Sequence, residues 1–290
     1  MLKRITFSLL LLLGTPSLAT LGMATSADAQ ALLPYTLPLD QEQLQADGES
    51  LASDAAQLAQ FQQFDEALAR AQLAAQLLPS NADVLSLLGS LYLQASEPQP
   101  DKAVITLERA KALQPENPLV MFALGNAYFT QQEYAKAAQS IESGLKLEPD
   151  NPNALFDLGN AYYKLSQYDK AIAQYEKSVS NDSAFWPAVN NIGLVMYEDG
   201  DVEGAITKWQ EAIELAGTEE TEPILAIAVA RYSQSPQNAE ATESAIAGLE
   251  RDPRYAEIEF LQENLWGEQL ITDTQVFFNT PTLQDLLLQL

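Results

Sequence analysis

The 290-residue chain contains no cysteine and no histidine. Their absence excludes disulfides, thiol nucleophiles, and metal sites built from thiolate or imidazole ligands. It also removes the side chain that most often transfers protons near neutral pH. Basic residues are scarce as well: 15 lysines and arginines stand against 40 aspartates and glutamates, a formal net charge of −25. Phosphate binding needs a basic face, so nucleic acid is not expected as a partner. The acidic charge serves solubility and suits a basic or apolar protein partner.

Motifs of common enzymes are also missing from the chain. It has no P-loop, no G-x-G-x-x-G and no G-x-S-x-G sequence. Residues 198–201 resemble a fragment of a calcium loop, but the twelve-residue ligand spacing is absent. We therefore expect no enzymatic activity, no cofactor and no specific metal site. The surplus of carboxylates leaves one alternative, an acidic carrier of divalent cations such as Mn²⁺ or Ca²⁺.

The amino terminus has the three parts of a secretory signal peptide. Lys3 and Arg4 precede an apolar stretch over Ile5–Leu13, and two Ala-x-Ala cleavage sites lie within residues 27–31. The apolar stretch is shorter than the ~20 residues of a spanning helix. Residues 1–31 are therefore predicted to be a cleaved signal peptide, and a retained anchor is the alternative. Export without stable membrane insertion after cleavage follows from this prediction.

The rest of the chain repeats itself with a period of 34 residues. The sequence LGNAY occurs at residues 124–128 and again at residues 158–162. This pattern resembles the tetratricopeptide repeat, in which Leu-Gly, Tyr, Ala, a large residue, Ala and Pro recur at fixed positions. The repeat before these two carries the same pattern at Leu88, Gly89, Tyr92, Ala103, Leu107, Ala110 and Pro115. Glycine is unfavourable inside a helix, so its recurrence predicts a close helix crossing, which we expect to lie against the alanines of the second helix.

The resemblance extends over six repeats, with weaker matches at both ends. Val229 replaces the glycine of the last repeat, and Asp54 and Ala55 replace Leu-Gly in the first. The predicted ranges are 48–81, 82–117, 118–151, 152–185, 186–219 and 222–255. Residues 32–47 are predicted to be an extended lead and the start of the first helix, and residues 256–290 to be C-terminal capping helices. The resemblance implies an all-α solenoid, a right-handed superhelix of antiparallel helix pairs with a concave groove.

The resemblance also implies where a ligand binds. In this family, ligands contact the first helix of each repeat from inside the groove. The matching residues here are amides, aromatics and one leucine: Phe122, Asn126, Phe129, Phe156, Asn160, Tyr163, Asn190, Leu194 and Tyr197. Amides can hydrogen-bond an extended peptide backbone, and aromatics supply apolar pockets. An average repeat carries similar residues, so the set indicates where binding occurs rather than what binds. The lysines and arginines that grip a terminal carboxylate in some relatives are absent.

The tail from Phe260 to Thr274 resembles that of exported tetratricopeptide proteins of cyanobacteria. Its sequence is FLQENLWGEQLITDT. This resemblance implies a scaffold of the periplasm or the thylakoid lumen that assists the assembly of protein complexes.

Overall fold

The computed structural model describes residues 40–217 and 220–290. The predicted signal peptide, residues 1–31, lies outside the described residues, as does most of the predicted lead. Within the described ranges every regular element is a helix, which confirms the all-α fold class. None of these helices combines the length and the apolarity that a bilayer crossing needs.

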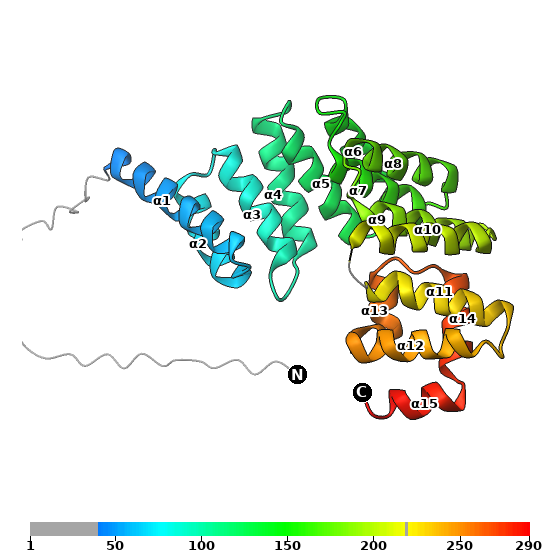
Figure 1. The fold of residues 1–290 in the computed structure, drawn as a ribbon. Helices are drawn as coiled ribbons and strands as arrows, with labels where there is room; N and C mark the ends of the chain where they lie inside the picture. The colour runs from blue at the N-terminus through cyan, green and yellow to red at the C-terminus, as the bar shows by residue number, and fades with distance from the viewer. Residues whose placement is uncertain (1–39, 218–219) are drawn as a thin grey trace, which may run out of the picture. The chain divides into compact units, whose positions relative to one another are not determined.

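The first twelve helices form six pairs in which each helix packs mainly against its neighbour in the chain (Figure 1). The pairs are α1 (Gln41–Gln60) with α2 (Phe64–Leu77), α3 (Ala82–Gln94) with α4 (Pro100–Leu113), α5 (Pro118–Thr130) with α6 (Tyr134–Leu145), α7 (Pro152–Lys164) with α8 (Tyr168–Asn181), α9 (Trp186–Glu198) with α10 (Val202–Ala216), and α11 (Thr221–Gln234) with α12 (Ala239–Arg251). Four shorter elements follow: η1 (Pro253–Ala256), α13 (Ile258–Glu263), α14 (Glu268–Phe278) and α15 (Pro281–Leu287).

Short polar side chains set the starts of several helices. Asn81, Asn117 and Asn151 accept backbone N–H groups at the beginnings of α3, α5 and α7. Proline follows directly after two of these caps, where its missing N–H costs nothing. Asp40 caps α1 in the same way, with its carboxylate 3.1 Å from the Glu42 N–H.

The turns inside the pairs repeat the 34-residue period in their backbone. Gln132, Ser166 and Gly200 follow the first helices of three successive pairs with φ of 62°, 56° and 91°. Only the last of these is the residue type that adopts positive φ without strain. Gln62 takes the same conformation 70 residues before Gln132. That spacing exceeds two periods by two residues, because the turn before α4 is longer.

The recurrent glycines lie where the two helices of a pair cross. A Cβ on Gly89, Gly125, Gly159 or Gly193 would overlap a side chain of the second helix. The overlapped side chains are Leu107, Ile141, Tyr175 and Trp209, all buried. Each of these glycines therefore makes room for the large residue of its partner helix. The expected approach to an alanine is seen at Gly125, where the Ala137 backbone oxygen lies 3.4 Å from the position of an added Cβ.

Candidate functional site

The C-terminal segment, residues 253–287, covers the first helices of the last two pairs. Its helix α14 packs against both α9 and α11 (Figure 1). The segment and the last two pairs share one apolar core, which includes Leu225 and Leu270. Phe277 stacks on Tyr232 with ring centroids 4.2 Å apart. The face on which the resemblance places a ligand is thus occupied here by the protein's own chain.

Polar contacts fix the position of this segment. The Glu198 carboxylate, at the end of α9, accepts the N–H groups of Gln269 and Leu270 at 3.1 and 3.0 Å. These N–H groups belong to the first turn of α14 and have no acceptor within their own helix. Tyr197 donates its hydroxyl to Asp273 at 2.7 Å. Side chains of α9 therefore hold the start and the middle of α14.

Apolar burial also holds this segment against the repeats. Seven apolar side chains of the segment are buried: Leu261, Trp266, Leu270, Ile271, Phe277, Phe278 and Leu283. At roughly 1.5–3 kcal/mol each, their burial contributes about 10–21 kcal/mol as an upper bound. Burial on this scale accounts for the docked position of the segment.

Five of the nine predicted groove residues are buried, which corrects the expectation that they line an open surface. Asn190, Leu194 and Tyr197 on α9 are only 1–2% exposed, because α11 and α14 cover them. Phe122 packs against Gly144 inside its own helix pair. Tyr163 is 6% exposed, and its hydroxyl has no hydrogen-bond partner among the described residues.

The other four predicted residues belong to α5 and α7. Phe156 is half-buried, and the centroid of its ring lies 5.4 Å from that of Phe185. Asn126, Phe129 and Asn160 line a small open hollow between the two helices. We call this cavity of about 150 Å³ the α5–α7 hollow, and Thr130 and Asp157 complete its lining.

A larger hollow adjoins the first and shares Phe129 and Thr130 with it. This cap hollow measures about 960 Å³ and lies between the ends of α5 and α7 and the C-terminal segment. Repeat and cap both contribute to its wall: Phe129, Thr130, Gln132, Tyr134, Lys164, Glu259, Gln262, Glu263, Leu265, Trp266, Gly267, Glu268, Ile271 and Thr272. The resemblance identified only the repeat side, because the pattern of a repeat does not say where a cap docks.

A polar network orients the side chains of the α5–α7 hollow. The Asn160 Oδ1 accepts the Tyr175 hydroxyl at 2.8 Å and the Asn191 amide at 3.0 Å. The Asn160 Nδ2 then remains a donor without a partner among the described residues. Burial raises the pKa of Asp157 to about 6, although a hydrogen bond from Asn126 opposes the rise. No cationic side chain of the described residues hydrogen-bonds to Asp157. The sequence indicated Asp157 only by its position between two predicted groove residues, Asn126 and Asn160.

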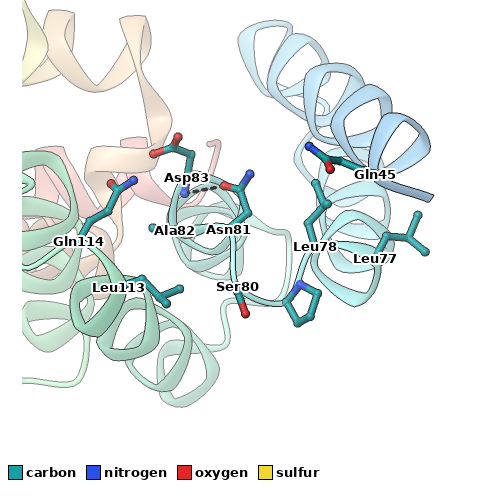
Figure 2. Close-up of a pocket in the computed structure, with 10 residues that line it drawn as sticks. Gln45, Leu77, Leu78, Ser80, Asn81, Ala82, Asp83, Leu113 and Gln114 are labelled. Atoms are coloured by element: carbon teal, nitrogen blue, oxygen red, sulfur yellow. Dashed lines mark hydrogen bonds between the residues drawn. The ribbon is translucent and has the colours of Figure 1, made fainter. Parts of the chain in front are cut away.

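A third hollow, near the start of the chain, contains none of the predicted residues. It measures about 560 Å³ and lies where the α2–α3 turn meets the ends of α1 and α4 (Figure 2). Figure 2 shows Leu78 and Leu113 at its sides and the bond from the Asp83 N–H to Asn81 between them. This bond is the cap of α3, so the polar groups there already serve the fold.

The alternative of a cation carrier gains no support from the structure. No group of three or more carboxylates in the described part of the chain is placed to hold a metal ion. Glu222 on α11 is half-buried and accepts the Trp266 indole N–H at 3.3 Å. Burial raises its pKa to about 7.

Comparisons with known proteins agree with this arrangement of helix pairs. The tetratricopeptide repeat family matches residues 122–188 and 156–220, and the family of YpiA-like tetratricopeptide repeats matches residues 93–143. No curated protein matches the chain. Residues 93–220 therefore consist of tetratricopeptide repeats.

Solved structures share the fold at low sequence identity. PilF of Pseudomonas aeruginosa is 17% identical, with a TM-score of 0.59 over 78% of this chain and 98% of its own. YrrB, described as a tetratricopeptide protein with an unusual peptide-binding site, is 20% identical, with a TM-score of 0.51 over 64% and 94%. MamA of Desulfovibrio magneticus RS-1 is 18% identical, with a TM-score of 0.52 over 58% and 94%. Proteins of this fold are generally non-catalytic scaffolds for protein–protein interaction.

Proposed function

We propose that this protein is an exported scaffold that binds a segment of another protein in the α5–α7 hollow and the cap hollow. One observation carries the proposal: the ligand-binding face is open at α5 and α7, whereas the C-terminal segment covers it at α9 and α11. The open part retains Asn126, Phe129 and Asn160, which offer hydrogen bonds to a peptide backbone and an apolar ring. YrrB indicates that this fold can accommodate a peptide-binding site.

Photo-crosslinking tests where the partner binds. A photoreactive residue at Asn126 is expected to capture a defined partner when the protein is produced in its native compartment. The same residue at Glu176, which is exposed on the second helix α8, serves as the control. A partner captured from Glu176 but not from Asn126 would exclude the hollows as the binding site. Mass spectrometry of the captured protein then identifies the partner and the complex to which it belongs.

Export to the periplasm or the thylakoid lumen is the second part of the proposal. It rests on the basic, apolar and small-residue parts of residues 1–31 and on the tail that resembles cyanobacterial exported proteins. A role in complex assembly follows from export combined with a peptide-binding face. Sequencing the amino terminus of the protein from fractionated cells is expected to find it at residue 30 or 32. An intact Met1 in the cytosolic fraction would contradict export.

A further inference from the structure

The Asp157 carboxyl lines the α5–α7 hollow with only neutral neighbours there. Asn126 and Asn160 stand on either side of it, and Phe129 and Thr130 close the hollow. Asp157 takes part in no ion pair among the described residues. A carboxylate withdrawn from water without a cation is unfavourable, and burial raises its pKa accordingly. A cationic group that entered the hollow would remove this cost.

The size of the α5–α7 hollow suits one side chain rather than a helix or a whole peptide. Its volume of about 150 Å³ is close to that of a cavity that accepts one benzene molecule. The adjoining cap hollow, at about 960 Å³, has room for several residues. A ligand that fills both therefore inserts one side chain and lays its neighbouring residues across the larger space.

The charges around the cap hollow favour a basic occupant. Glu259, Glu263 and Glu268 line it from the C-terminal segment, and Lys164 is its only cationic lining residue. The rings of Phe129 and Tyr134 meet edge to face with centroids 5.2 Å apart, and their faces attract both apolar groups and cations. An acidic segment would be repelled by the three glutamates and by Asp157.

On the basis of the function proposed above, we infer that the partner segment is basic. One lysine or arginine side chain enters between Asn126 and Asn160 and pairs with Asp157. The Asn160 Oδ1 already accepts two hydrogen bonds, and the Nδ2 of the same amide donates to a carbonyl of the partner backbone. Adjoining residues of the partner lie over Phe129 and Tyr134.

Selection from a phage library of random twelve-residue peptides tests this inference. The purified protein is expected to enrich peptides that carry lysine or arginine next to an apolar residue. Their affinity, measured by fluorescence anisotropy, is expected to fall about tenfold or more in Asp157→Asn, the effect of losing one charge-assisted bond. Asp157→Asn preserves the shape of the side chain and is not expected to unfold the protein. Glu176→Gln removes the same charge from the opposite helix and is expected to leave affinity unchanged.

Phe129→Ala separates this inference from the proposed function. Peptides whose binding is lost in Phe129→Ala but retained in Asp157→Asn would overturn the basic anchor and leave the hollow as the binding site. Peptides unaffected by both variants, or a selection that enriches nothing, would count against the site and the inference together. Enrichment of acidic or uncharged peptides would overturn the inference alone. Raising the salt from 0.15 M to 0.5 M is expected to weaken binding of basic peptides in the wild type more than in Asp157→Asn.

Discussion

At the scale of single residues, the glycines of the helix crossings differ in how much space surrounds them. The Cα of Gly159 faces the ring of Tyr175, which is fully buried and cannot move aside. Gly248 on α12 has its nearest neighbour, the Thr221 Cγ2, at 3.6 Å from the position of an added Cβ. The first position has no room for a methyl group, and the second accepts one at ordinary contact distance.

Alanine substitution is therefore expected to act in opposite directions at these two glycines. Gly159→Ala should lower the free energy of unfolding by about 1–3 kcal/mol through overpacking. Gly248→Ala should raise it by up to about 1 kcal/mol, because alanine favours the helix. Urea denaturation followed by circular dichroism measures both changes. If both substitutions raised the free energy of unfolding, helix preference rather than space would control these positions.

The repeat pattern predicts a residue's place on its helix but not what covers it. Asn126 and Asn190 both lie on first helices, in positions that face a ligand in this family. Asn126 is exposed, whereas Asn190 is 1% exposed. The difference comes from α11 and the C-terminal segment: the Glu222 carboxylate of α11 accepts hydrogen bonds from Asn190 and from the Trp266 indole, which lies outside the repeats. The repeat pattern therefore places both asparagines on first helices, but it does not predict that Asn190 is covered; binding at Asn126 stays a prediction.

At the scale of helices, Glu198 links the repeats to the C-terminal segment. Its carboxylate accepts two N–H groups of the first turn of α14, as an N-cap side chain would, although Glu198 belongs to α9. The apolar residues of 256–290 predict capping helices. The bond from the Gln269 N–H to Glu198 has no signature in the sequence, because the two residues are 71 positions apart.

Glu198→Ala is expected to loosen α14 by roughly 0.5–2 kcal/mol, the range for loss of a helix cap. Hydrogen exchange of residues 268–278 should become faster, whereas exchange in α3 to α8 should remain unchanged. Glu176→Ala, an exposed acid on α8, is the matched control and should leave α14 unchanged. Equal acceleration in all helices would mean that Glu198 supports the whole fold and does not act as a local cap.

At the scale of the whole molecule, two carboxyl groups make stability depend on pH. Burial raises the pKa of Asp157 to about 6 and that of Glu222 to about 7, above their ordinary values of 3.8 and 4.5. The folded protein therefore binds these protons more tightly than the unfolded chain does. Stability is greatest below the unfolded pKa values and falls as pH rises toward 7. Asp65 and Asp252, with lowered pKa values, act only in more acidic solution.

The thermal midpoint is accordingly expected to decrease between pH 5 and pH 8. Glu222→Gln should flatten this decrease and stabilise the protein at pH 8 by on the order of 1–3 kcal/mol. Glu176→Gln controls for the general effect of removing one negative charge. A pH profile of Glu222→Gln that parallels the wild type would assign the dependence to other carboxylates.

The hydrogen bonds from α14 to Glu198 also bear on the order in which the contacts of the protein form during folding. The described hydrogen bonds between neighbouring pairs join residues about 31 apart, but those from Glu198 span 71 and 72. Contacts that are close in sequence form quickly, and distant ones form late. The residues of α14 leave the ribosome after those of α9 and α11, since synthesis runs from the amino terminus. Until they arrive, the face of α9 and α11 is uncovered, so a growing chain exposes a longer stretch of first-helix face than the folded protein does.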